Sequence, residues 1–87
     1  MKKWETVFKS LANLNRLEIV KMLSKDKHMN VGEITDKLKI SYKSTSQHLI
    51  LLKRVGVLED RSQVGHVFYY INPDLSQEFS KALKLFV

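Results

Sequence analysis

The chain contains no cysteine, one proline and three glycines among its 87 residues. The absence of cysteine excludes disulfides, thiolate metal sites and cysteine-based redox sensing within this chain. No apolar run approaches the roughly 20 residues that span a bilayer, and the N-terminal MKKWETVFKS lacks the apolar core of a signal peptide. We therefore expect a cytoplasmic protein that does not enter a membrane.

The composition is typical of a folded protein, and its charge is unevenly distributed. A chain of this length favours a single domain over residues 1–87, small enough for oligomerisation to add useful stability. The net charge of +6 is compatible with a polyanionic partner. Between residues 37 and 58 there is no acid, and the basic residues there are Lys37, Lys39, Lys43, Lys53 and Arg54.

The acid-free stretch includes the segment SYKSTSQHLILLKRVG, which predicts a helix over residues 41–55. Ser41 suits a helix N-cap, and Gly56 suits the left-handed position that often follows a helix. One face of this helix is formed by Thr45, Leu49 and Leu52, with His48 beside them. The opposite face carries Lys43, Ser46, Gln47, Ile50 and Arg54. Such a face fits a DNA major groove, although a merely solvated helix face has the same pattern.

Two further helices are predicted before this segment. The first covers residues 3–11, and its apolar face belongs either to the core or to a dimer interface; it is formed by Trp4, Val7, Phe8 and Leu11. The second begins at an Asn13 cap and ends in a polar loop at residues 24–28. Its apolar positions are Leu14, Leu17, Ile19, Val20, Met22 and Leu23. The helix dipole disfavours Arg16 in the first turn. We therefore expect Arg16 to form a surface salt bridge or to bind a nearby carboxylate or a phosphate.

The remaining segments complete a pattern of helices followed by a hairpin. Asn30 is expected to cap a helix over residues 31–38, which a short turn joins to the helix at 41–55 as a helix-turn-helix. After Gly56, residues 57–62 and 66–71 alternate as strands around a loop at residues 63–65. The tip can donate hydrogen bonds to phosphates or minor-groove acceptors through Arg61, Gln63 and His66. A last amphipathic helix presents Leu75, Phe79, Leu83 and Phe86, again for the core or for a dimer.

Four motifs in this order match a known family. Leu11–Ile19 resembles L-A-D-P-T-R-L-x-I, with Asn13 at the aspartate and Leu14 at the proline, and Val31–Ile40 resembles V-x-E-L-x-x-x-L. Residues 41–52 resemble S-x-x-T-V-S-x-H-L-x-x-L, and residues 56–70 resemble G-L-V-x-x-R-R-E-G-R-x-x-Y-Y. Together these motifs resemble the ArsR family of winged helix-turn-helix repressors, over about residues 11–72.

The resemblance implies a mainly α-helical domain with a β-hairpin wing, in the order helix-helix-helix-helix-strand-strand-helix. It implies a homodimer held by the terminal helices, through Trp4, Val7, Phe8, Leu11, Leu75, Phe79, Leu83 and Phe86. It also implies a sequence-specific transcription regulator, a repressor, that binds an inverted repeat in double-stranded DNA. The helix at 41–55 would lie in the major groove, and the wing at 57–71 on the adjacent groove or backbone. The predicted DNA-binding residues are Ser41, Tyr42, Lys43, Ser44, Ser46, Gln47, Arg54, Arg61, Gln63 and His66.

Several residue roles differ from the family pattern or stay open. Gln47 is the leading base-contacting residue because its amide can pair bidentately with adenine. His66 replaces the usual second wing arginine, which makes that contact dependent on pH. His48 matches a histidine whose role is structural more often than ligating. Ile50 replaces a polar residue, and either contacts a thymine methyl group or lies on the dimer side.

The sequence fits other functions less well than it fits DNA binding. The family's metal sites use cysteines near residues 28–32 or histidines on the last helix, and this chain has neither. We therefore expect no metal and no cofactor. The effector stays unknown. The sequence has no paired carboxylates, no nucleophile–histidine pair and no phosphate-binding loop at a suitable spacing, so it does not predict an enzyme. A winged helix used as a protein-interaction module is the main alternative, and stacking of RNA bases on the aromatic strand residues is a third.

Overall fold

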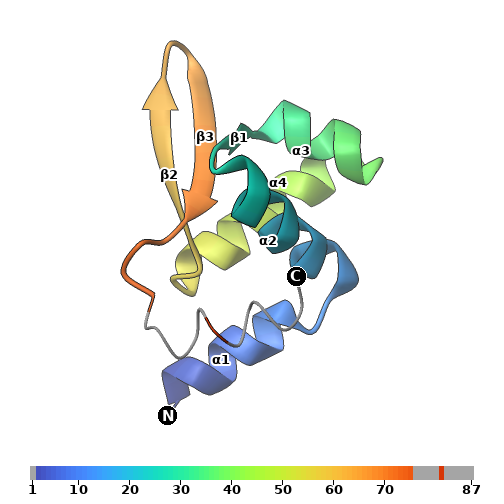
Figure 1. Ribbon diagram of the computed structural model, residues 1–87. Helices are drawn as coiled ribbons and strands as arrows, with labels where there is room; N and C mark the ends of the chain where they lie inside the picture. The colour runs from blue at the N-terminus through green and yellow to red at the C-terminus, as the bar shows by residue number, and fades with distance from the viewer. Residues whose placement is uncertain (1, 76–80, 82–87) are drawn as a thin grey trace.

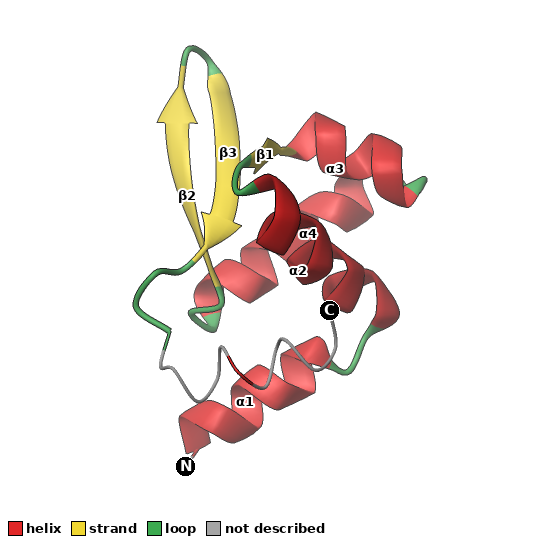
Figure 2. Ribbon diagram, viewed as in Figure 1, coloured by secondary structure: helices red, strands yellow, loops and turns green. Residues whose placement is uncertain are grey.

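The computed structural model describes residues 2–75 and residue 81, with the side chains of residues 2–4 outside that description. The elements follow in the order α1 (Lys2–Leu11), α2 (Leu14–Asp26), β1 (Met29–Asn30), α3 (Val31–Leu38), α4 (Tyr42–Arg54), β2 (Leu58–Gln63) and β3 (His66–Ile71) (Figure 1). The strands form one antiparallel sheet in the order β1-β3-β2, beside the helices (Figure 2). The predicted winged helix-turn-helix fold is thus confirmed, while the predicted last helix lies outside the described residues.

The starts of the central helices are set by side-chain caps, as the sequence predicts. Asn13 caps α2 and Ser41 caps α4, each by accepting from a backbone amide three residues on. Asn30 begins α3 with a reciprocal pair, because its side chain accepts from the Glu33 amide at 2.8 Å and the Glu33 carboxylate accepts from the Asn30 amide at 2.9 Å. Lys39 ends α3 in the left-handed region, at φ 58°. Lys39 and the Ser41 cap thus set where α3 ends and where α4 begins.

The hydrophobic core lies where α2, α3, α4 and the base of the hairpin meet. Its fully buried side chains are Ile19, Val20, Ile34, Thr45, Leu49, Leu52, Val57 and Leu58. The predicted inner face of α4 is therefore confirmed. Thr45 is polar, but its hydroxyl donates to the Ser41 carbonyl oxygen at 3.0 Å, which removes the cost of burying it. Within the described residues, no helix is long and apolar enough to cross a membrane.

The hairpin is tighter than the sequence predicts. Gln63 pairs with His66, so the turn contains only Val64 and Gly65 rather than three residues. Both have positive φ angles, 51° and 78°, as a type I′ turn requires. Glycine tolerates this conformation, whereas a β-branched valine is strained there. The tip of the hairpin extends away from the helices (Figure 1).

Two local predictions are wrong, and one strand pairing was not predicted. Helix α2 continues through residues 24–26, because polar residues such as Lys25 are good helix formers and need no burial. Leu14 is 76% exposed at the start of α2, so it does not join the core. The pairing of Met29 and Asn30 with β3 was not predicted, because two residues are too short to show an alternating pattern.

Candidate nucleic-acid interface

The outer face of α4 carries the polar and basic groups that the sequence assigns to it. Lys43, Gln47 and Arg54 are exposed, Ser46 is half-buried, and Ile50 is 50% exposed. At the start of the helix, Ser41 and Tyr42 are exposed and Ser44 is half-buried. The Ser44 amide donates to the Ser41 hydroxyl oxygen at 3.0 Å, which leaves the Ser41 hydroxyl hydrogen available for another acceptor. One helix face thus presents amide, hydroxyl and cationic donors together.

The wing contributes a second group of donors. Arg61, Gln63 and His66 are all exposed on the two strands near the turn. The guanidinium of Arg61 lies 5.9 Å from the centre of the Tyr70 ring, and the ring centre of His66 lies 6.2 Å from that of Phe68. These ring contacts restrict the polar side chains while leaving their donor atoms in solvent. The predicted wing residues are therefore on one projecting element, separate from the α4 face.

The basic stretch is partly neutralised by acids from other elements. Lys37 Nζ lies 3.2 Å from Asp26 Oδ2, and Lys53 Nζ lies 2.9 Å from Asp60 Oδ1. The hydrogen bond with Asp60 is the main cause that raises the pKa of Lys53. Of the five basic residues, Lys39, Lys43 and Arg54 have no ion pair within the described part of the chain. A stretch without acids in sequence is therefore not a surface without acids.

Arg16 and His48 lie close together between α2 and α4. Burial, and then the charge of Arg16, lower the pKa of His48 below its usual 6.5. The Nε atom of Arg16 is buried without a hydrogen-bond partner in the described part of the chain, where no ion pair of Arg16 is found either. The expected surface salt bridge is therefore not observed there. His48 is half-buried beside the buried face of α4, and its structural role stays a prediction.

The residues expected at a dimer interface divide into three groups. Val7 and Leu11 are 4% and 5% exposed, so each protomer buries them in its own core. Phe8 is 47% exposed, and Leu75 is half-buried against the core. The remaining members lie outside the described side chains: Trp4, Phe79, Leu83 and Phe86. Among the described residues of α1, Phe8 is therefore the large apolar group that a partner could cover.

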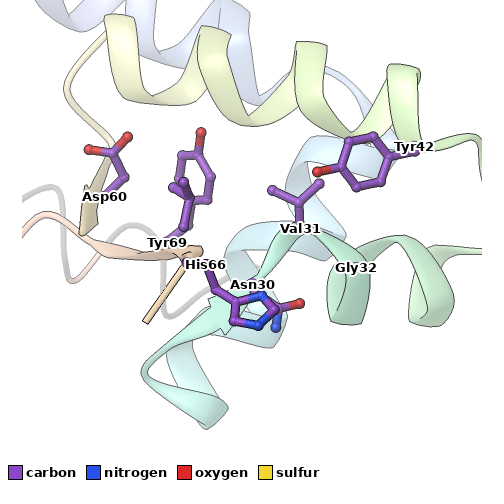
Figure 3. Close-up of a pocket in the computed structure, with 9 residues that line it drawn as sticks. Asn30, Val31, Gly32, Tyr42, Asp60, His66 and Tyr69 are labelled. Carbon is purple, nitrogen blue, oxygen red and sulfur yellow. The ribbon is translucent and has the colours of Figure 1, made fainter. Parts of the chain in front are cut away.

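A cavity that the sequence did not predict lies between the wing, the start of α3 and the start of α4. Its volume is about 470 Å³, and its walls include Val31, Tyr42, Asp60, His66 and Tyr69. Tyr69 extends from β3 toward α4, and Tyr42 lies at the far end of the same space (Figure 3). The described residues include no group of three or more metal-ligating side chains, here or elsewhere.

Comparisons with known proteins agree with this architecture. The profile described as "Bacterial regulatory protein, arsR family" matches residues 13–60. The transcriptional activator HlyU of Vibrio cholerae is 38% identical over 66 residues, which are 76% of this chain and 60% of HlyU. Its solved structure is similar with a TM-score of 0.83 at 34% identity, over 97% of this chain and 87% of that chain.

Two other solved structures are similar over nearly the whole chain. The transcriptional repressor PagR of Bacillus anthracis has a TM-score of 0.84 at 30% identity, over 99% of this chain and 94% of that chain. The homodimeric winged helix-turn-helix DNA-binding domain Mb0332 of Mycobacterium bovis has a TM-score of 0.82 at 25% identity, over 97% of this chain and 74% of that chain.

The fold and the exposed α4 face define a winged helix-turn-helix domain of the kind found in transcription regulators. The match over residues 13–60 places it further: the chain belongs to the ArsR family of bacterial regulatory proteins. It spans 60% of the length of its relative HlyU.

Proposed function

We propose that the protein is a homodimeric transcription regulator, a repressor, that binds an inverted repeat in double-stranded DNA in the cytoplasm. It acts by binding and carries out no catalysis. The observation that carries this proposal is the exposed face of α4, where Lys43, Gln47 and Arg54 stand clear of the buried residues that hold the helix. Mb0332, which is described as a homodimeric DNA-binding domain, and PagR, which is described as a repressor, support it.

The residues of the interface take different roles. Gln47 contacts base edges in the major groove, with adenine as the favoured partner, and Lys43 and Ser46 contact bases beside it. Ser41, Tyr42 and Ser44 lie where a helix start meets the phosphate backbone, and Arg54 adds a phosphate contact at the other end. The projecting wing reaches the adjacent groove or backbone with Arg61, Gln63 and His66.

The proposed dimer uses the terminal segments of the chain. The exposed Phe8 side chain lies on α1, whose other described apolar residues, Val7 and Leu11, already pack in the core. A two-fold dimer would cover the Phe8 surface of both protomers and place the two α4 helices on successive half-sites, about 10 base pairs apart. Trp4, Phe79, Leu83 and Phe86 complete the proposed interface.

The alternative function is a winged helix that binds another protein. Such a module is expected to present a neutral or acidic face, whereas Lys39, Lys43 and Arg54 leave the α4 side basic. A salt series separates the two functions. The logarithm of the DNA affinity should fall linearly with the logarithm of the salt concentration, with a slope of about −0.9 for each phosphate contacted. The affinity for another protein should fall much less.

Selection of bound DNA from a random pool tests the proposed function, with and without added divalent metal ions. We expect enrichment of an inverted repeat whose half-site centres lie about one helical turn apart. We also expect the same sequences with and without metal, because the described part of the chain holds no metal-ligating cluster. A pool that stays random after repeated selection would contradict sequence-specific binding.

A further inference from the structure

The cavity beside the recognition helix α4 is large enough to hold a small organic molecule. At about 470 Å³ it falls within the range of ligand sites, which is roughly 300–1,000 Å³. Three separate elements wall it: the start of α3 with Val31, the start of α4 with Tyr42, and the inner face of the wing with Val67 and Tyr69 (Figure 3). Two tyrosines and two valines give these walls an apolar and aromatic character.

Several polar groups at the cavity have hydrogen-bonding capacity left over. Asp60 directs Oδ1 to Lys53, and no hydrogen bond to Oδ2 is found among the described residues. No hydrogen bond of the Tyr42 or Tyr69 hydroxyl is found within the described part of the chain either. Burial and the nearby Asp60 charge raise the pKa of Tyr69, so its hydroxyl stays protonated at neutral pH. An occupant could therefore meet a carboxylate oxygen and two phenolic hydroxyls.

The charge of the lining discriminates between classes of occupant. Asp60 is the only acid among the nine lining residues, and neither lysine nor arginine lines the cavity. A phosphate or carboxylate ligand would meet this acid, whose charge is partly offset by Lys53, a residue outside the lining. A positively charged group would instead meet Asp60 and two tyrosine side chains, whose rings and hydroxyl oxygens attract cations.

We propose that this cavity binds a small aromatic cation, a flat ring that carries an ammonium group, and that its occupancy opposes DNA binding. The ring packs against Tyr42, Tyr69 and Val31, and the ammonium group donates to Asp60 Oδ2 and to the Tyr69 hydroxyl oxygen. The effect on DNA rests on the proposed function, because Tyr42 and His66 line the cavity and are also assigned to the DNA interface. A molecule held between them separates the recognition helix and the wing from the DNA backbone.

Titration of the full chain with three indole probes tests the charge preference. Tryptamine, indole and indole-3-acetate share one ring system and differ in charge, and amide chemical shifts report where each of them binds. We expect saturable shifts at Gly32, Tyr42, Gly65 and Tyr69, with affinity falling from tryptamine to indole to indole-3-acetate. Shifts that stay linear to 10 mM or spread over α1 and α2, or tightest binding of indole-3-acetate, would overturn the proposal.

Matched variants on one strand separate a specific site from general loss of structure. Tyr69→Phe removes a hydroxyl from the cavity, whereas Tyr70→Phe removes one from the opposite face of β3. We expect Tyr69→Phe to weaken tryptamine binding about fivefold, as for one lost hydrogen bond, and Tyr70→Phe to leave it unchanged. Asp60→Asn should remove the preference for tryptamine over indole. Equal effects of the two tyrosine variants would overturn the site.

A DNA competition experiment tests the regulatory part. Tryptamine at saturation should weaken binding of the selected DNA by the wild-type chain at least tenfold, and the Tyr69→Phe chain should need more tryptamine for the same effect. Unchanged DNA affinity at saturation would overturn the opposition between ligand and DNA. If the chain binds no selected DNA even without tryptamine, the proposed function fails, while the shift titration still decides whether the cavity binds the cation.

Discussion

Lys53 Nζ lies 2.9 Å from Asp60 Oδ1, which links the last turn of the recognition helix to the first long strand of the wing. The side chains are 45% and 29% exposed, so water and salt screen the pair and its effect on stability is small. Its proposed consequence for DNA binding is larger, because Asp60 holds a cation that could otherwise face a phosphate.

Asp60→Asn should therefore strengthen DNA binding that does not depend on sequence. The substitution frees Lys53 and removes an acid from the DNA side, so the salt slope should become steeper by about one unit. Fluorescence anisotropy at several salt concentrations measures this slope. The matched control is Glu5→Gln, which releases Lys9 from an exposed pair on α1 with the same change in net charge. A slope that changes equally in both variants would show that only net charge matters.

The valine in the hairpin turn gives a prediction about stability. Val64 has a φ of 51° and is 90% exposed, so it is strained without contributing to packing. Val64→Asn should raise the free energy of unfolding by about 1 kcal/mol, since asparagine tolerates the left-handed region. Thermal unfolding should shift upward by about 4–8 °C. Ser62→Asn, at an exposed strand position, is the control, and a Val64→Asn chain no more stable than wild type would contradict the turn conformation.

The pair Arg16 and His48 gives a prediction about pH. Because burial and Arg16 lower the pKa of His48 in the folded chain, the unfolded chain binds this proton more tightly. The contribution of His48 to the free energy of unfolding is thus fully present above pH 6.5 and is lost as the pH falls through the pKa of the folded chain. Arg16→Met should raise the pKa of His48, but leave it below 6.5 because burial is the larger cause. Histidine ring resonances followed by NMR against pH measure this pKa. An unchanged pKa in the Arg16→Met chain would show that the Arg16 charge does not act on His48.

Much of the fold follows from local signals in the sequence. The caps at Asn13, Asn30 and Ser41 each join residues three positions apart, and the inner face of α4 follows from helical periodicity, so both were predicted. The partners of Lys37 and Lys53 were not, because Asp26 and Asp60 come from other elements and only the fold brings them close. The cavity at Tyr69 was missed for the same reason: no local pattern records where three elements leave space. The DNA-binding role of individual residues remains a prediction.

Substitution of Phe8, an exposed aromatic residue on α1, tests the proposed dimer. Phe8→Asp should raise the dissociation constant of the dimer about tenfold or more, because a charge replaces an apolar group that the partner is proposed to cover. Sedimentation velocity at several concentrations measures this constant. Leu14→Asp is the matched control, since Leu14 is even more exposed but lies at the start of α2, outside the proposed interface. An unchanged dimer in the Phe8 variant, or an equal loss in both, would remove α1 from the interface.

The most direct test of the central claim is the ratio of specific to nonspecific DNA affinity in a Gln47→Ala chain. If Gln47 contacts a base edge, the substitution should weaken the binding free energy for the selected inverted repeat by about 1–3 kcal/mol per protomer. The binding free energy for random DNA should stay nearly constant. Gln63→Ala, the same substitution on the wing, should change both affinities by a similar small factor. An equal loss on both DNAs in the Gln47 variant, or no loss on either, would contradict base recognition by the exposed face of α4.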